Sequence, residues 1–407
     1  MSISAASRLE PGEISFEFEE LFFSRTDQAG IIKFGNAVFQ RIAGYSWQEL
    51  LDKPHKIIRH PDTPRAVFWL LWHTIKQGRP IGAFVKNRAK DGRFYWVFAI
   101  VTPVEGGYLS VRLKPSSDVL TVVKREYAAL AARERSEKLA PEESAKLLLA
   151  RLAELGFVDY ASFLAAAIGA EVASRDEHLG RMPDATITRF NELVGGARAL
   201  IDHAAVIADA YASNESVPFN FRVLAAQLGQ EGTAIGVIST NYSLLSMEMK
   251  SILSQFVEAA QGVRRAINDG YFLACTARIQ REVIAFFATE KDVASGREQE
   301  MSLLDKQQAE YRAKAAAGLA DIAKKIEGFK QACVEMTRLA AGLEVTRVMG
   351  KVECSRHLKV KDRMDELLND LESFQKTIAA SLKEIERANH KISNDADRLL
   401  ASSQRAA

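Results

Sequence analysis

The sequence predicts an α+β domain with an antiparallel five-stranded sheet and short helices, followed by an all-α region of long helices that pack as a bundle or coiled coil. Between residues 14 and 115, short apolar runs alternate with turns that contain Gly or Pro, which is typical of strands and short helices. Beyond Pro115 the strand signals vanish, and apolar residues recur at spacings of three and four. We therefore expect two architectures in one chain.

Turn and cap residues divide the first region into elements. Asp91-Gly92 and Gly106-Gly107 lie between apolar runs and predict tight hairpins. Ser46 with Glu49 forms a capping box, which marks the start of a short helix. The expected elements are a lead-in strand or helix at 14–23, a hairpin turn at 27–30, short helices at 36–44 and 46–51, an irregular stretch at 53–65, a helix at 66–77, and strands at 81–88, 93–104 and 108–113.

The second region is expected to be helical almost throughout. Pro141 suits the first turn of a helix, whereas Gly229 and Gly232 mark a break or a hairpin tip. The expected pieces are helices at 118–139, 141–156, 161–179 and 184–211, a break at 214–218 and a long helix at 233–290. By composition we divide the chain into a sensor domain at 14–115, a helical linker at 116–180, a helical hairpin at 181–290 and a heptad-patterned region at 300–405.

Two stripes of apolar residues predict the core of the long helices. The first stripe consists of Leu319, Ile322, Ile326, Phe329, Cys333, Met336, Ala340 and Leu343. The second consists of Met364, Leu367, Leu371, Phe374, Ile378, Leu382, Ile385, Ile392, Ala396 and Leu399. Spacings of three and four, strictly alternating in the first stripe and with one slip in the second, place each stripe on one helix face. The pattern predicts an antiparallel bundle or coiled coil, with a bend or close contact near Gly350.

Composition excludes several classes of protein. With 407 residues, of which 47% are hydrophobic and 26% charged, the chain is long enough for roughly two to three globular domains. Lys plus Arg number 54 and Asp plus Glu 52, so the net charge of +2 gives no field that favours nucleic acid or an anionic membrane. The cysteines, Cys275, Cys333 and Cys354, have no ligand-like spacing. We expect no metal site and a reducing, cytoplasmic location.

No segment has the composition of a membrane anchor. The most apolar windows, at 163–173 and 274–288, fall short of the roughly 18 residues that a spanning helix needs. The first 20 residues become acidic where a signal peptide requires an apolar core. We therefore expect no membrane span.

The densest part of the first region is Ile58 to Trp96. It combines three Trp and two His with several Arg and Lys between short apolar runs. Such a mixture suits a small domain that encloses an aromatic, anionic ligand.

Residues 23–112 resemble the PAS domain of bacterial aerotaxis receptors, which is a flavin-binding type. The matching words are Gly44-Tyr45, Pro54-His55, RHPDTP at 59–64, Phe68 with Trp72, VKNR at 85–88, DGRFYWV at 91–97 and LSVR at 109–112. The resemblance covers about a quarter of the chain. It implies a PAS fold, noncovalently bound FAD and a signal that depends on the redox state of the flavin.

The residue chemistry within these words agrees with FAD. The three-ring system needs an apolar slot, and the side chains that suit its walls are Phe68, Trp72, Phe84 and Trp96. Amide side chains both donate and accept hydrogen bonds, so we expect Asn36 and Asn87 at the ring edge. Charged or titratable groups that suit the phosphates or the charge of the ring are Arg59, His60, Lys86 and Arg88, with Asp62 orienting them.

Each of these residues also has a purely structural interpretation. Trp72 and Trp96 would suit the core of any aromatic-rich domain, and His60 could cap the helix that follows. Lys86 and Arg88 alternate with Val85 and Asn87 along a strand, so one of the two pairs would face solvent.

A second likeness lies at 219–239, FNFRVLAAQLGQEGTAIGVIS, which is similar to the hairpin tip of methyl-accepting chemotaxis receptors. The matching residues are Asn220, Ala225, Ala226, Gly229, Gly232 and Val237. The charged positions of the motif differ. Where the family has Glu or Arg, this sequence has Leu224, Gln227, Gln230 and Thr233. This part resembles a degenerate receptor tip, and ordinary coupling to the chemotaxis kinase is in doubt.

These observations predict a cytoplasmic sensor that binds FAD and signals through a dimeric helical bundle to a protein partner of a chemotaxis-like pathway. The alternative is a ligand-free PAS scaffold that dimerises and organises other proteins. We expect no enzyme, because no reacting group lies beside an activating one and no phosphate-binding Gly loop or HExxH motif is present.

Overall fold

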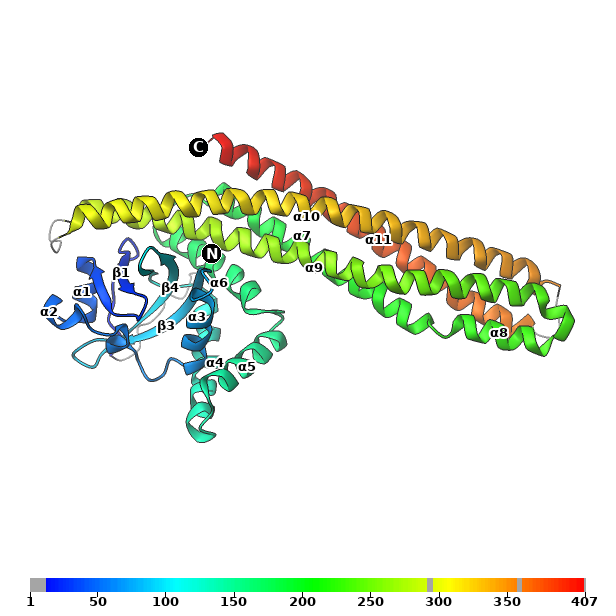
Figure 1. Cartoon of the computed structure of the whole chain (residues 1–407), viewed down its shortest axis with the longest axis horizontal. Helices are drawn as coiled ribbons and strands as arrows, with labels where there is room; N and C mark the ends of the chain where they lie inside the picture. Colours follow the sequence, from blue (N-terminus) through cyan, green and yellow to red (C-terminus); the bar gives the residue numbers. More distant parts are fainter. Residues whose placement is uncertain (1–11, 291–295, 357–360, 406–407) are drawn as a thin grey trace, which may run out of the picture. The chain divides into compact units, whose positions relative to one another are not determined.

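The computed structural model describes residues 12–290, 296–356 and 361–405 (Figure 1). The chain forms two compact units, which we describe separately. Unit 1 comprises Met1–Thr188 together with Asn268–Ala316, and unit 2 comprises Arg189–Ile267 together with Ala317–Ala407. The helices at Thr233–Thr289 and Arg297–Cys354 each contribute residues to both units. The boundaries of the units therefore differ from those of the segments at 181–290 and 300–405 that composition suggests.

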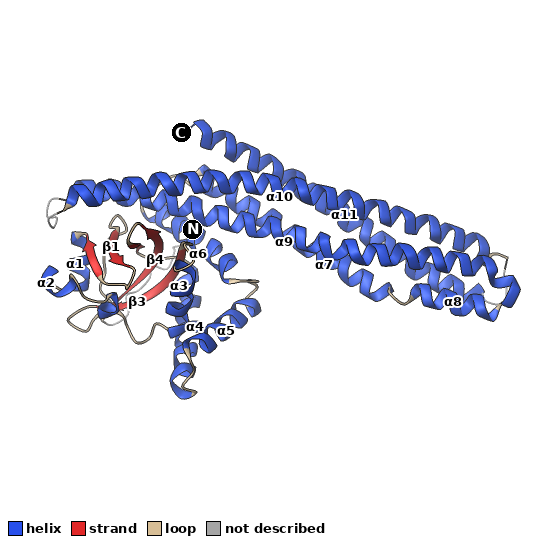
Figure 2. Cartoon of the chain, viewed as in Figure 1, coloured by secondary structure: helices blue, strands red, loops and turns tan. Residues whose placement is uncertain are grey.

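Unit 1 contains the predicted five-stranded antiparallel sheet, drawn in red in Figure 2. Its strands are β1 (Phe22–Asp27), β2 (Ile32–Gly35), β3 (Ile81–Arg88), β4 (Phe94–Val104) and β5 (Gly107–Leu113), in the order β2-β1-β5-β4-β3. Both expected hairpins are present, since β3 pairs with β4 and β4 with β5. Gly107 is required at the second turn, because a Cβ atom there would lie 1.9 Å from the carbonyl oxygen of Thr26 on β1.

Short helices connect the strands. They are α1 (Ala37–Ala43), α2 (Trp47–Leu50), the 3-10 helix η1 (His55–Ile58) and α3 (Arg65–Ile75). Asn36 caps α1 by accepting a hydrogen bond from the backbone of Phe39, and Gly44 ends the helix with a positive φ of 71°. The capping box of Ser46 and Glu49 is confirmed.

Residues 14–21 form neither of the lead-in elements that the sequence suggested. Phe16 and Leu21 are buried as a strand or helix would bury them. However, side chains bind two backbone carbonyls of this segment: Lys114 donates to Phe16 at 2.6 Å, and Arg175 donates to Phe18. These carbonyls have side-chain partners in place of a ladder, and β1 begins only at Phe22.

Helices beyond the sheet complete unit 1. They are α4 (Asp118–Ser136), α5 (Pro141–Glu154), α6 (Tyr160–His178) and the neighbouring ends of α9 (Thr233–Thr289) and α10 (Arg297–Cys354). On α9 the ring of Phe287 lies 5.1 Å from that of Phe23 and 6.1 Å from that of Phe34. On α10, Glu300 pairs with Arg25 of β1.

Unit 2 is an all-helical bundle supplied by one chain. It contains α7 (Ala185–Asn214) from Arg189 onward, α8 (Val217–Gln227), the 3-10 turn η2 (Gly229–Gly232), the remaining parts of α9 and α10, and α11 (Lys361–Arg405). The predicted break at 214–218 and the tip at Gly229–Gly232 are confirmed. The predicted close contact is also present, because a Cβ atom on Gly350 would lie 2.8 Å from Leu368.

The buried stripes follow the predicted pattern with two shifts, and the predicted core residue Cys333 is only partly buried. Leu339 is fully buried in place of Ala340, and Leu368, at 1% exposure, in place of Leu367. In each case a spacing of three residues and a spacing of four exchange places along the stripe. The side chain that points into the core is then buried: Leu339 instead of the smaller Ala340, and Leu368 instead of Leu367. Among the described residues, no helix combines the length and the apolar composition needed to cross a membrane.

Candidate ligand-binding site

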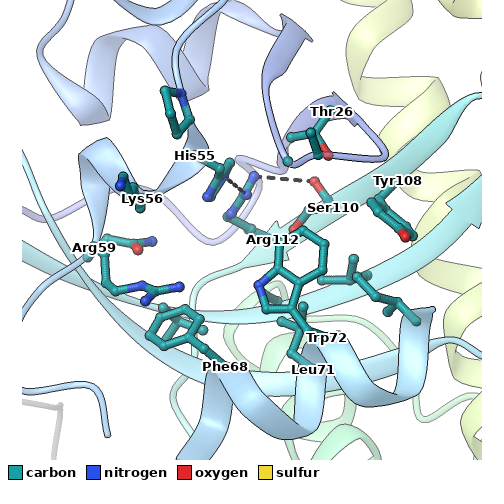
Figure 3. Close-up of a pocket in the computed structure, with 18 residues that line it drawn as sticks. Thr26, His55, Lys56, Arg59, Phe68, Leu71, Trp72, Tyr108, Ser110 and Arg112 are labelled. Carbon is teal, nitrogen blue, oxygen red and sulfur yellow. Dashed lines mark hydrogen bonds between the residues drawn. The ribbon is translucent and has the colours of Figure 1, made fainter. Parts of the chain in front are cut away.

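The PAS-like part of unit 1 encloses a cavity of about 220 Å³ (Figure 3). Its walls come from α3, η1 and one face of the sheet. The lining residues are Thr26, Ala29, Gly30, Pro54, His55, Lys56, Arg59, Phe68, Leu71, Trp72, Ile75, Val85, Asn87, Ala99, Val101, Tyr108, Ser110 and Arg112. A volume of this size suits a fused ring system rather than a whole dinucleotide.

Strand alternation decides which residues face the cavity. On β3, Val85 and Asn87 line it, whereas Lys86 and Arg88 point to the opposite face. Ala99 on β4 follows the same rule. The sequence left open which pair of β3 faces the ligand, and the structure assigns Val85 and Asn87 to the cavity.

Helix α3 supplies the apolar wall. Phe68, Leu71, Trp72 and Ile75 are spaced by three, one and three residues, so one face of the helix presents all of them. Gly30 faces Trp72, and a Cβ atom at Gly30 would lie 3.0 Å from the indole ring. Since Gly30 also has a φ of 78°, both the space and the backbone favour glycine there.

Arg112 is the most deeply buried charge in the cavity wall, with 2% exposure. Its guanidinium donates to the hydroxyl of Ser24 at 3.0 Å and to the carbonyl oxygen of Ser110 at 3.3 Å. It also lies 2.6 Å from Nε2 of His55. Dashed lines in Figure 3 mark hydrogen bonds between the residues drawn there. None of these partners is a carboxylate. Burial lowers the pKa of Arg112 to about 10.

His55 accepts the hydrogen bond from Arg112 as a neutral imidazole. Burial, together with the charges of Arg112 and Arg59, holds the pKa of His55 well below its usual range. A neutral ring has one acceptor nitrogen, which fits the short contact with a guanidinium donor. His55 therefore orients Arg112 without neutralising it.

Arg59 and Asn87 present polar atoms that have no hydrogen-bond partner within the described residues. The guanidinium carbon of Arg59 lies 3.4 Å from the centroid of the Phe68 ring, and its buried Nε is unpaired. Asn87 is 3% exposed and its Nδ2 is also unpaired. The backbones of the two residues meet in an isolated antiparallel bridge. Buried donors normally find partners, so these groups are suited to a ligand.

The charge of the cavity wall is positive. Among the residues that the structure describes, its lining includes the cations Lys56, Arg59 and Arg112 and no Asp or Glu. Uncompensated positive charge beside apolar and aromatic walls favours a ligand that is aromatic and carries or acquires negative charge.

A shallower surface pocket of about 550 Å³ adjoins the cavity. The two share Arg59, Phe68 and Trp72, and the outer pocket adds Arg65, Trp69, His73, Lys76 and Pro141. The indole of Trp69 stacks on the imidazole of His73 with centroids 4.8 Å apart. This pocket therefore offers cations and flat rings next to the mouth of the cavity.

Four of the eleven side chains expected to bind a cofactor line the cavity: Arg59, Phe68, Trp72 and Asn87. Asn36 is instead fully buried as the cap of α1, where its amide donates to Leu21 and to Glu290. His60 accepts a hydrogen bond from the backbone of Asp62.

The other expected residues lie on the far face of the sheet. Lys86 pairs with Asp62 at 2.9 Å and lies over the ring of Phe94, while Arg88 is exposed. Trp96 packs against Tyr127 of α4, and Phe84 against Phe163 of α6. Strand alternation accounts for all of these positions except that of Asp62.

Sequence reasoning missed several residues of the cavity wall. The most informative are His55, Tyr108, Ser110 and Arg112. His55, Ser110 and Arg112 lie in words that resemble the aerotaxis family, although no role followed from the words alone. Period-2 alternation from Tyr108 would have placed Ser110 and Arg112 on one face. No group of three or more His, Cys, Asp or Glu suited to a metal occurs in the described residues.

Comparison with known proteins agrees with this geometry. The family model of the PAS fold matches residues 32–110. This region has the PAS fold. It covers β2, β3, β4, the start of β5 and the helices that form the cavity. All of β1 precedes the match, and the last residues of β5 follow it.

Two relatives share sequence with the PAS region. The aerotaxis receptor of Escherichia coli (strain K12) is 40% identical over 121 residues, which cover 28% of this chain and 24% of the receptor. The nitrogen fixation regulatory protein of Klebsiella pneumoniae is 30% identical over 103 residues, covering 23% of this chain and 21% of the regulator. The matches thus span about a quarter or less of each relative.

Among solved structures, the PAS domain of a protein from Colwellia psychrerythraea is similar, with 20% identity and a TM-score of 0.22. It covers 23% of this chain and 85% of that one. The light-state structure of the blue-light photoreceptor Aureochrome1 LOV has 22% identity and a TM-score of 0.22, and covers 28% of this chain and 90% of that one.

Proposed function

We propose that this chain is a sensor whose PAS cavity binds FAD noncovalently and whose helices carry the signal to a protein partner. The observation that carries the proposal is Arg112. It is a buried cation whose hydrogen-bond partners are Ser24, Ser110 and His55, none of them negative. A buried charge without a counter-ion costs stability, so its place in the wall of an aromatic cavity supports a ligand that compensates it.

The remaining wall fits a flavin ring. Phe68 and Trp72 provide apolar surface, and the unpaired Nδ2 of Asn87 can donate to an acceptor at the ring edge. Bound FAD would supply a ring that takes up and returns electrons. Around it, Arg59 and Arg112 would favour a form of the ligand with greater negative charge.

The outer pocket supports FAD rather than a shorter flavin. The cavity of about 220 Å³ holds the ring system, so a dinucleotide must extend beyond it. The adjoining pocket offers Arg65 and Lys76 for phosphate groups and Trp69 for an adenine ring. FMN and riboflavin would use less of this surface.

Contacts in unit 1 provide a route from the cavity to the helices. Glu134 of α4 accepts hydrogen bonds from the first turn of α3, the helix that carries Trp72. Glu290 at the end of α9 accepts from Asn36 and Ala37 at the start of α1. A change at the cavity wall that shifted α3 or α1 would alter these buried contacts.

We further propose that the output is protein binding rather than catalysis, in the cytoplasm, as a homodimer and in a chemotaxis-like pathway. The likeness of residues 219–239 to a receptor tip supports this proposal. Since Leu224, Gln227, Gln230 and Thr233 replace the family's charged residues, we do not expect conventional kinase coupling. One chain already supplies the long helices of unit 2, so a dimer would pair two complete bundles.

Titration of flavin-free protein with FAD, FMN and riboflavin tests the proposal. Quenching of flavin fluorescence should saturate at one FAD per chain, with FMN weaker than FAD and riboflavin weakest. No saturable binding of any of the three would favour the alternative, a ligand-free PAS scaffold that organises other proteins.

A further inference from the structure

A second cavity lies in unit 1, among the helices that follow the sheet. It has a volume of about 110 Å³ and is bounded by α4, α5 and the start of α6. Its walls are formed by Val119, Val122, Val123, Glu126, Tyr127, Leu148, Arg151, Leu152, Leu155, Phe157, Tyr160 and Phe163. It shares no residue with the first cavity.

The interior of this cavity is almost entirely apolar. Val123, Leu148, Leu152 and Phe163 are all buried, with exposures between 4% and 7%. The charged residues of the wall, Glu126 and Arg151, pair with each other at 2.8 Å, with Arg151 largely exposed. They form a polar edge and leave the interior without charge.

Such a space is unusual in a folded domain. Protein interiors pack as densely as organic crystals, and voids larger than a water molecule are few. Water needs two to four polar partners to occupy a cavity, and apolar cavities of about 150 Å³ stay dry and bind benzene or xenon. A cavity of about 110 Å³ with these walls therefore suits an apolar guest rather than water.

The cavity also contacts the sheet from the side opposite the first cavity. The hydroxyl of Tyr160 donates to the carbonyl oxygen of Gly82 on β3 at 3.1 Å. The ring of Tyr127 lies 6.3 Å from that of Trp96 on β4. A guest that moved Tyr127 or Tyr160 would therefore act on the strands that carry Asn87 and Ala99.

We propose that the cavity among α4, α5 and α6 is a second binding site, which takes a small uncharged apolar molecule no larger than about one aromatic ring. The proposal does not depend on flavin binding, because it rests on different residues. It gives the domain a second input on the reverse face of the sheet.

Methyl NMR of the full-length protein tests this site, with benzene and xenon as probes. Benzene should cause saturable shifts at the methyl groups of Val123, Leu148 and Leu152, and xenon should shift the same signals. No shift, or shifts that grow linearly without saturation, would overturn the proposal.

Two variants and a control sharpen the test. Val119→Phe adds a ring at the edge of the cavity and should weaken benzene binding by about tenfold or more, whereas Leu149→Phe, on the exposed side of α5, should not change it. Equal benzene affinity in Val119→Phe and the parent would contradict the site.

If Val119→Phe does not fold, the variant Leu152→Ala tests the proposal instead. It enlarges the cavity and should tighten binding of benzene by about threefold, and unchanged affinity would count against the proposal.

Discussion

The carboxylate of Glu134 on α4 accepts a hydrogen bond from the backbone N–H of Ala66 at 3.1 Å, in the first turn of α3. The same carboxylate accepts from the N–H of Arg65 and from the hydroxyl of Ser144 on α5. The residue at the N-cap of α3 is Pro64, which offers no side-chain cap. A residue about 70 positions away therefore does the work of a local N-cap.

Glu134→Ala should destabilise unit 1 by about 1 to 3 kcal/mol, because it removes the acceptor of the buried donors of Ala66 and Ser144 and of the part-buried N–H of Arg65. Urea denaturation measures the loss, and faster hydrogen exchange at Ala66 would locate it. Glu137→Ala, an exposed change just beyond α4, serves as the control. Equal stability of the two variants would show that the cap contributes nothing.

A second buried carboxylate gives a pH dependence of stability. Glu171 on α6 accepts from the hydroxyl of Ser117 at 2.6 Å and from the backbone N–H of Ser116 at 2.7 Å. Burial raises the pKa of Glu171 above its usual value despite these bonds. The folded protein therefore binds a proton at Glu171 more readily than the unfolded chain does.

Because the pKa of Glu171 is higher in the folded protein, its contribution to the free energy of unfolding should increase as the pH falls from neutral towards about 4.5. When the pH is lowered from 7 to 5, the free energy of unfolding of the wild type should increase relative to that of Glu171→Gln. Urea denaturation of both proteins at the two pH values checks this. A relative stability that stays constant, or falls with acidification, would contradict the raised pKa.

The variant Arg112→Met tests whether the charge of Arg112 serves ligand binding or the stability of the fold. The change removes a buried cation that has no carboxylate partner in the described part of the chain, so the ligand-free protein should lose no more than about 1 kcal/mol of stability. Affinity for FAD should fall by about 10- to 100-fold, as expected for a hydrogen bond to a charged group. Arg88→Met, at an exposed residue that points away from the cavity, should bind FAD as the parent does. Strong unfolding of Arg112→Met with unchanged FAD affinity would make Arg112 a structural residue.

Asn87 and Lys86 form a matched pair on β3. They are neighbours in the chain, but only Asn87 lines the cavity, while Lys86 pairs with Asp62. Asn87→Ala should weaken FAD binding by about 3- to 10-fold through loss of one hydrogen bond, and Lys86→Ala should leave it unchanged. Equilibrium dialysis with FAD gives both affinities. The reverse order would place the ligand on the other face of the sheet.

The register of α11 can be tested with another pair of neighbours. Leu368 is 1% exposed and lies against Gly350, while Leu367 is partly exposed. Leu368→Ala should lower the free energy of unfolding of unit 2 by about 2 to 5 kcal/mol, as core truncations do. Leu367→Ala should cost clearly less. Thermal unfolding of the two variants compares them, and equal losses would contradict the assigned core.

Local sequence signals were sufficient for most of the fold. Turn pairs such as Asp91-Gly92, the capping box at Ser46 and the change of apolar period after Pro115 are short-range patterns, and the structure follows them. Segment 14–21 departs from them, and there distant residues, Lys114 and Arg175, bind the carbonyl groups of Phe16 and Phe18.

The candidate site was less accessible from sequence. Asn36 and Asn87 have the same chemistry, yet one caps α1 and the other lines the cavity, since burial and partners depend on the tertiary fold. The partners of Arg112 in the described residues, none of them a carboxylate, likewise became visible only in the folded structure. Glu134 could not be paired with α3 from sequence, because no local pattern connects them.

The absorption spectrum of the purified full-length protein tests the central claim most directly. A flavin bound in the cavity should make the protein yellow and give the absorption bands of an oxidised flavin, and denaturation should release FAD in a ratio of about one per chain. The same spectrum of Arg112→Met should show a smaller flavin content. A colourless protein that also fails to take up added FAD would contradict the account.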